Sequence, residues 1–396
     1  MVNPLVKLQK NSIRRTSTKL KSSVNQIKNM RKIYEFEVLR GLLALWVVLG
    51  HITNSIALKI PGPFPQNLNG RLAVDVFIIL SGFVITHLIF SKKETYLKFI
   101  VRRFFRLFPA YFVVLVISSL MINLSIDALE GTFQTSVNKN RIALFMIAQN
   151  DLGNHFIWHL TMLHGVIPNS IAKNSAFTLV GQAWSVSVEW QYYLLIVPFL
   201  RVLTSNRFLI RLLLILFVVL AGIKWPYTNG KMGLLSSHLY LFGIGMSCSY
   251  LWRKIYFKEL KISLRELNTV TISALIVTHL IFEVTLPIMV WILFFHLALR
   301  NLLQKPNQLP NPFQNFFNSN VLLYLGKISY SMYLCHMTVL YYVMWFLNKY
   351  SFGIGLHALL MLTIIPFFTI ILSHFLNKFI EKPGIYLGQT LARKFR

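Results

Sequence analysis

The sequence predicts an all-α polytopic membrane protein with about ten transmembrane helices and both termini in the cytoplasm. Of its 396 residues, 55% are hydrophobic and only 13% are charged, about half the charged share of an ordinary soluble domain. Long apolar runs follow one another along the chain, and basic residues gather between alternate runs. The 40 Lys and Arg against 12 Asp and Glu therefore indicate cytoplasmic loops beside a lipid bilayer, not binding of nucleic acid.

The predicted spans are apolar segments of roughly membrane-crossing length. They cover residues 37–58, 72–91, 107–126, 179–200, 208–224, 234–252, 269–283, 285–300, 328–347 and 355–377. With the N-terminus inside, 30 of the 40 Lys and Arg fall on the cytoplasmic side, 8 on the other side, and two at span ends. This bias follows the positive-inside rule and supports ten spans. Residues 304–320, rich in Pro, Asn and Gln, form a cytoplasmic linker before the last two spans.

Around the spans, the chain divides into a few further parts. Residues 1–33 hold nine Lys and Arg and no acid, which predicts a basic cytoplasmic leader on anionic lipid and not a cleaved signal peptide. The transmembrane domain covers 34–384. Within it, 127–178 form the largest extracytoplasmic segment, with a short interfacial or re-entrant helix at 142–149. Residues 385–396 form a basic cytoplasmic tail.

Three histidines and two cysteines are residue types that form metal or disulfide sites. Their pattern in this sequence predicts neither kind of site. His155, His159 and His164 are spaced as metal ligands sometimes are, but no Asp, Glu or Cys joins them on a shared helix face. We expect surface or cleft histidines and no metal. Cys248 and Cys335 fall inside apolar segments and are too few for a disulfide framework.

The first span carries Arg40 and His51, eleven residues apart. At about 100° and 1.5 Å per residue, both point to nearly the same side of a helix, about 16 Å apart along its axis. His51 then lies near the middle of the bilayer, where an ionisable residue normally faces a bundle interior or a wet cavity and marks a functional site. A histidine that serves helix packing is the alternative.

Ionisable side chains recur in other spans. Asp75 lies at a depth close to that of His51, where a carboxylate would fix the imidazole tautomer and raise its basicity. Glu189 is the only acid of its span, and His336 is a second histidine inside the membrane. Interhelical hydrogen bonds are the alternative for each, and close helix packing is the alternative for Ser81 and its glycine neighbour. The supporting candidates are Ser81, Trp184, Ser329, Tyr330, His336 and Glu381, the last either a solvated charge or a partner for arginines.

Arg103 and Arg106 lie three residues apart at the expected start of the third span. On a helix they share one face, where two guanidinium groups can hold a phosphate-bearing ligand. The alternative is charge that sets topology and contacts lipid headgroups.

Six segments, in this order between residues 35 and 384, resemble the acyltransferase-3 family of membrane enzymes, which move acetyl or other short acyl groups onto sugar hydroxyls. They are Glu37-Val-Leu-Arg40-Gly with His51, Val74-Asp75-Val-Phe77 with Ser81-Gly82-Phe83, Arg103-Phe-Phe-Arg106-Leu-Phe-Pro109, Trp184-Ser185-Val-Ser187-Val-Glu189, Gly326-Lys-Ile-Ser329-Tyr330 extending to His336, and Ile380-Glu381-Lys382-Pro383. The chain departs from the family pattern at Glu37, Trp190 and Cys335, where the family often has Asp, a second acid and Trp.

The resemblance implies ten spans, no bound cofactor, a cytoplasmic acyl-CoA donor and a carbohydrate acceptor, in a bacterial inner membrane. We expect Arg103 and Arg106, helped by Arg40, to hold the donor phosphates. His51 then either takes the proton of an acceptor hydroxyl or is itself acylated. Asp75 is expected to orient His51, and Glu189 to hold the acceptor or share the proton.

The acceptor and the class of function stay open. The acceptor is lipopolysaccharide, capsule, exopolysaccharide, peptidoglycan or a small glycoside. The competing function is a proton-coupled transporter or carrier of lipid-linked sugars, which explains the buried ionisable groups but not the arginine pair; a sensor with the same fold is a third reading. No soluble hydrolase-like domain follows within the 396 residues, so we expect another protein to carry out any second transfer step.

Overall fold

The computed structural model describes residues 33–56, 68–92, 94–203, 231–281, 286–304 and 316–395. Every regular element within these ranges is a helix, so the all-α expectation is confirmed there. The basic leader up to residue 32, the predicted span 208–224 and most of the linker 304–320 lie outside the described residues.

The described residues contain four or five candidate membrane spans. Four are long and apolar enough: α2 (Tyr34–Ser55), α3 (Gly70–Ser91), α12 (Leu286–Leu303) and the continuous helix Ile354–Ala392. The fifth is the pair α4 (Tyr96–Leu120) and α5 (Ile122–Glu130), bent by 63°, if the pair is one span. Other predicted spans correspond to α8 (Trp184–Leu203), α10 (Leu239–Tyr256), α11 (Leu264–Ile281) and α14 (Asn320–Leu347), whose polar and aromatic side chains give them lower hydropathy. The helices therefore show a multi-pass membrane protein, and four or five qualifying spans lie in the part of the chain that the structure describes.

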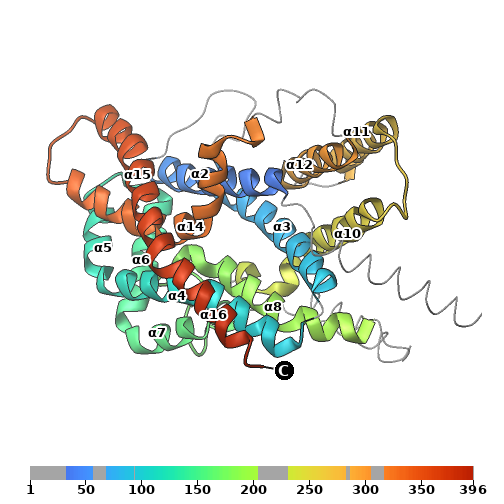
Figure 1. The fold of residues 1–396 in the computed structure, drawn as a ribbon. Helices are drawn as coiled ribbons and strands as arrows, with labels where there is room; N and C mark the ends of the chain where they lie inside the picture. The colour runs from blue at the N-terminus through green and yellow to red at the C-terminus, as the bar shows by residue number, and fades with distance from the viewer. Residues whose placement is uncertain are drawn as a thin grey trace, which may run out of the picture.

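Helices α2, α3 and α14 form the centre of the bundle, with α10 and α12 beside α3 (Figure 1). Glycines allow the closest crossings, as small residues do between membrane helices. A Cβ on Gly41 of α2 would lie 2.8 Å from the backbone nitrogen of Gly326 on α14. A Cβ on Gly82 of α3 would lie 2.5 Å from the carbonyl oxygen of Phe242 on α10, which confirms the packing interpretation of that glycine.

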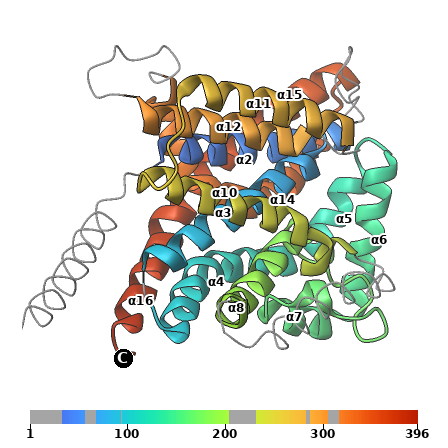
Figure 2. The same ribbon diagram turned by 90° about the vertical axis from the view of Figure 1, so that its right-hand side faces the viewer.

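The last helix continues beyond its predicted end. Helix α15 (Ile354–Leu376) passes through a π-helical turn at Asn377–Glu381 into α16 (Lys382–Ala392), so residues 385–392 of the predicted basic tail are helical. Helix α16 lies along α4 in both views (Figure 2), where Gly384 meets Pro109 and Gly388 meets the side chain of Phe105. Because α4 begins at Tyr96, its paired arginines stand on a packed helix and not in a loop.

The segment 127–178 packs against the C-terminal end of α2. It contains α6 (Ser136–Asn150) and α7 (Leu152–Leu160), beside α5 in Figure 1. Thr135 caps α6, because its hydroxyl accepts the backbone N–H of Asn138 at 3.1 Å. The helix therefore begins before the predicted residue 142 and includes Asn138 and Arg141, both buried.

Candidate active site

Two pockets lie along α2, and each contains one of its two predicted functional residues. The arginine pocket, of about 290 Å³, has the polar lining residues Arg40, Ser81, Arg103, Arg106, Ser185, Glu189, Tyr193, Ser329, Tyr330 and Tyr333. The histidine pocket, of about 270 Å³, has the polar lining residues His51, Asn54, Asn69, Arg71, Ser118, Asn140, Arg141, Gln182, Trp184, Tyr333 and Tyr341. Val74 and Tyr333 line both pockets, so the two cavities are neighbours.

Helix α2 positions Arg40 and His51 against the same two neighbours, α3 and α14. Arg40 faces α3 residues such as Ser81 and α14 residues such as Tyr330, whereas His51 faces Val74 and Tyr333. The eleven-residue spacing correctly indicates a shared side of the helix. It does not indicate that the two residues line separate cavities.

Arg103 and Arg106 point from α4 into the arginine pocket, where Arg40 joins them from α2. The guanidinium group of Arg103 lies over the rings of Phe99 and Tyr193, at 6.0 and 5.9 Å from their centroids. Arg102 does not line this pocket, because it forms an ion pair with Glu94 instead. The pocket thus collects three cations suited to an anionic ligand.

Carboxylates accompany these cations. Glu189 of α8 accepts hydrogen bonds from Ser81, at 3.1 Å, and from Tyr193. Glu381, in the turn between α15 and α16, accepts from Ser331 at 2.7 Å and from the side chain of Asn377 at 2.8 Å. Glu381 is 3% exposed, so the predicted solvated charge is wrong and the alternative, a carboxylate near the arginines, fits its electrostatic effect on Arg106.

Ser329 and Tyr330 complete the α14 side of the arginine pocket. Ser329 donates to the carbonyl oxygen of Gly326 at 2.9 Å, and Tyr330 donates to the carbonyl oxygen of Leu107 at 2.8 Å. Both hydroxyl groups bond to backbone, but only the Tyr330 bond joins α14 to α4, since Gly326 lies on the same helix as Ser329.

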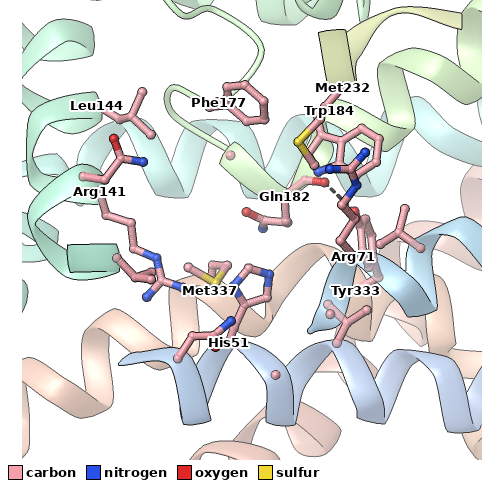
Figure 3. Close-up of a pocket in the computed structure, with 18 of the residues that line it drawn as sticks. His51, Arg71, Arg141, Leu144, Phe177, Gln182, Trp184, Met232, Tyr333 and Met337 are labelled. Carbon is pink, nitrogen blue, oxygen red and sulfur yellow. Dashed lines mark hydrogen bonds between the residues drawn. The ribbon is translucent and has the colours of Figure 1, made fainter. Parts of the chain in front are cut away.

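His51 contacts Arg141 and His336. Nη2 of Arg141 lies 2.9 Å from Nδ1 of His51 (Figure 3). The His336 ring lies 5.1 Å from the His51 ring. A guanidinium group only donates, so Nδ1 of His51 is the acceptor and a neutral ring carries its proton on Nε2. Nδ1 of His336 donates to the carbonyl oxygen of Tyr333 at 2.8 Å.

Asp75 lies elsewhere on α3. It is 5% exposed, and among the described residues it forms no hydrogen bond with His51. The charge that acts on Asp75 is that of Arg71, which lies one helical turn earlier on α3. The structure therefore gives Nδ1 of His51 a cationic partner where the sequence predicts a carboxylate.

Tyr333 separates the two pockets. Its hydroxyl group lies 2.7 Å from Oγ of Ser185 and donates to the carbonyl oxygen of Gln182, which joins α14 to the start of α8. The side chain of Gln182 in turn donates to the carbonyl oxygen of Leu334 at 2.6 Å. Trp184 lines the histidine pocket and stacks on His238 at 5.4 Å. These contacts fix the position of the Tyr333 ring between the cavities.

A family model described as an acyltransferase domain matches residues 33–378. The chain belongs to this acyltransferase family. It is also similar to the O-acetyltransferase OatA of Staphylococcus aureus, with 26% identity over 357 residues that cover 80% of this chain and 53% of the relative. An uncharacterized protein of Haemophilus influenzae is 28% identical over 165 residues, or 39% of this chain and 61% of that protein. The chain spans about half the length of the OatA relatives, and no solved structure matches it.

In this family member, the three histidines of the segment 127–178 are buried and line neither pocket, so the predicted surface or cleft position is wrong. His159 and His164 pack against Tyr111 of α4, whose hydroxyl lies 2.8 Å from Nδ1 of His159. His159 and His164 stack at 4.0 Å, and Thr178 lies 3.0 Å from Nδ1 of His155. Burial lowers the pKa of His159 well below its usual value and that of His164 to about 3.

Two residues at the site do not emerge from the sequence patterns. Arg141 is counted there only as one of eight extracytoplasmic basic residues, although its place in an apolar stretch outside the cytoplasm was a usable signal. Tyr333 lies within the segment that ends at His336, where nothing in the sequence separates it from Tyr330. Both positions depend on contacts between helices far apart in the chain.

Proposed function

We propose that this chain is a membrane-bound O-acyltransferase that moves an acetyl or other short acyl group from acyl-CoA to a hydroxyl group of a carbohydrate. The observation that carries the proposal is the pair of adjoining pockets along α2. One collects three arginines and the other presents a histidine, with the Tyr333 ring between them. Membership of the acyltransferase family and similarity to OatA support the same chemistry.

The donor binds in the arginine pocket. Arg103 and Arg106, with Arg40, hold phosphate groups through charge-assisted hydrogen bonds, which are stronger than neutral ones. The acyl end of the donor extends past Tyr333 toward His51. Ten spans with cytoplasmic termini, in a bacterial inner membrane, would place the arginine pocket toward the cytoplasm, where acyl-CoA is made, because Arg40 lies near the start of the first span.

The acceptor binds in the histidine pocket, which combines amide side chains with Trp184 and tyrosines. His51 takes the proton of the acceptor hydroxyl while the hydroxyl oxygen attacks the thioester carbonyl carbon. The carbon–sulfur bond then breaks, and the departing sulfur takes the proton back from His51. In the relay version, a ring nitrogen of His51 attacks the thioester carbonyl carbon first, the carbon–sulfur bond breaks, and the sulfur leaves as a thiol with the proton of the imidazole ring. The acceptor hydroxyl oxygen then attacks the acyl carbon, the bond from that carbon to the ring nitrogen breaks, and the hydroxyl proton returns to the ring. In either version Glu189, which lines the arginine pocket and not the histidine pocket, balances part of the charge of the arginines.

Free-thiol release from acetyl-CoA by the purified protein tests the proposal. Wild-type protein should release thiol, and His51→Ala should not. Labelled acetyl groups retained on the wild-type protein favour the relay, and their absence during turnover favours direct transfer. When a carbohydrate acceptor is supplied, acetyl-CoA that is bound without any thiol release would overturn the enzyme proposal and favour a sensor, whereas a transporter should show neither binding nor release.

A further inference from the structure

Arg141 is a buried cation with only neutral hydrogen-bond partners. Besides His51, its guanidinium group donates to Oγ of Ser55 at 2.7 Å and to Oδ1 of Asn138 at 3.3 Å. The residue is 8% exposed and lines the histidine pocket. A charge removed from water is costly unless an opposite charge is near.

No carboxylate of the described residues supplies that opposite charge. Eleven of the twelve acidic residues lie in the described part of the chain, and none of them forms an ion pair with Arg141 or lines the histidine pocket. The sequence between α2 and α3, residues 57–67, has no acidic residue. The pocket also contains Arg71, so its lining carries two positive charges and no negative one among the residues described.

The arrangement of the pocket favours a sugar-sized anion. Figure 3 shows Arg141 reaching His51 from one side, with Arg71, Gln182 and Trp184 on the other side. Amide groups and an aromatic ring suit a polar ring with hydroxyl groups, and a guanidinium group suits a planar carboxylate or a phosphate. An anion that takes the N–H groups of Arg141 also leaves Nδ1 of His51 free, at the position where an acceptor hydroxyl must lose its proton.

We propose that Arg141 is the anion-binding residue of the acceptor site, and that the carbohydrate acceptor carries a carboxylate or a phosphate group. This inference rests on the proposed function where it identifies the bound sugar as the acyl acceptor. The anion-binding site itself is inferred from the geometry of the histidine pocket alone. Arg141 is a specificity-determining residue in this account, and Arg71 adds the second positive charge.

Calorimetric titration of the full-length protein in detergent tests the proposal with three sugars that share one ring: glucose, glucuronic acid and glucose 6-phosphate. At 0.15 M salt, where diffuse surface charge is largely screened, at least one anionic sugar should bind wild-type protein tenfold or more tightly than glucose. The anion that binds identifies carboxylate or phosphate as the acceptor group.

Arg141→Met removes the charge and keeps most of the side-chain volume, and replacements of this kind are often tolerated in folded proteins. It should bring the anionic sugar to within about threefold of glucose, in line with the loss of one charge-assisted hydrogen bond. The matched control is Lys139→Met, because Lys139 is exposed on the same helix and does not line the pocket. It should keep the wild-type preference. Retained acetyl-CoA binding by Arg141→Met shows that the arginine pocket is folded.

Equal affinities for the three sugars, including no binding of any, would overturn the proposal even if Arg141→Met fails to fold. So would a preference that survives in Arg141→Met or is lost equally in Lys139→Met. Because sugar binding needs no acyl transfer, it is separable from thiol release. Anion preference without thiol release would leave this site standing and refute the proposed function, and thiol release without anion preference would do the reverse.

Discussion

The arginine pocket pairs its cations with a carboxylate, whereas the histidine pocket has two arginines and no acidic residue in its described lining. In the first, Glu189 is held by Ser81 and Tyr193 within a cavity that already contains Arg40, Arg103 and Arg106. In the second, Arg141 has only neutral partners. The two cavities share the wall residue Tyr333, yet their charges are balanced differently.

This difference indicates a division of work along α2. A cavity with several cations and an internal carboxylate can hold a highly charged ligand while it keeps part of its charge compensated in the empty state. A cavity with an uncompensated cation next to a histidine depends more strongly on its ligand for charge balance. We therefore expect substitutions in the two pockets to affect donor binding and chemistry separately.

The largest expected effect is that of His51→Ala on chemistry. A general base or nucleophile typically contributes about 10²- to 10⁴-fold to rate, so acetyl transfer should fall by that order. Because His51 lines the histidine pocket and not the arginine pocket, acetyl-CoA affinity should stay within about threefold of wild type. Stopped thiol-release assays and calorimetry measure the two quantities. A large loss of donor affinity would show that donor binding and chemistry are not separated between the two pockets.

Arg106→Gln should show the opposite pattern. Loss of a charge-assisted hydrogen bond of about 1.5–3 kcal/mol corresponds to roughly 10- to 100-fold weaker acetyl-CoA binding. The control is Arg102→Gln on the same helix, because Arg102 pairs with Glu94 outside the pocket. Calorimetric titration of both variants with acetyl-CoA compares them directly, and equal affinities in the two would contradict donor binding in the arginine pocket.

The sequence predicts these local patterns well because each depends on one helix. The three-residue spacing of Arg103 and Arg106 is enough to put both on one face, and the apolar run around His51 is enough to predict a helix with a histidine that faces a cavity. The same reasoning holds for α2 and α3, whose ends lie within three residues of the predicted spans.

Contacts between distant helices are beyond that reasoning. Depth alone suggests Asp75 as the partner of His51, but the partner in the structure is Arg141. Thr135 caps α6 early enough for this helix to include Arg141 and bring it to α2. Similarly, Glu381 follows the last span predicted from the sequence, whereas the π-helical turn continues that helix and buries the carboxylate beside Ser331. Neither arrangement leaves a periodic signal in the sequence.

Tyr333→Ala tests the wall between the pockets. Removal of the ring joins the cavities and gives water a path from the histidine pocket to the thioester, which closed active sites normally prevent. The ratio of acetyl-CoA hydrolysis to acetyl transfer should rise by roughly tenfold. Tyr341→Ala is the control, because Tyr341 lines only the histidine pocket. Product analysis with labelled acetyl-CoA measures the ratio, and an unchanged ratio would mean that Tyr333 does not exclude water.

The smallest expected effect is on the pH dependence of stability, and it concerns the histidines that line neither pocket. It tests whether these histidines, unlike His51, have only a structural role. Unfolded histidine has a pKa near 6.5, whereas burial lowers the pKa of His159 well below that value and that of His164 to about 3. As pH falls through 6.5, these histidines become protonated in the unfolded state but stay neutral in the folded state. Their contribution to stability is therefore complete above about pH 6.5 and declines toward pH 3, by up to about 1.4 kcal/mol per pH unit for each histidine.

The apparent Tm in detergent should accordingly fall between pH 7 and pH 5, and His164→Gln should make that fall shallower because one buried titrating group is gone. The exposed His279 of α11 provides the control, so His279→Gln should keep the wild-type slope. The slope is the useful quantity, since a glutamine in a buried site lowers Tm at every pH. Identical slopes in the three proteins would mean that His164 exchanges protons freely in the folded state, and the histidines packed against Tyr111 would then be as accessible as the one in the pocket.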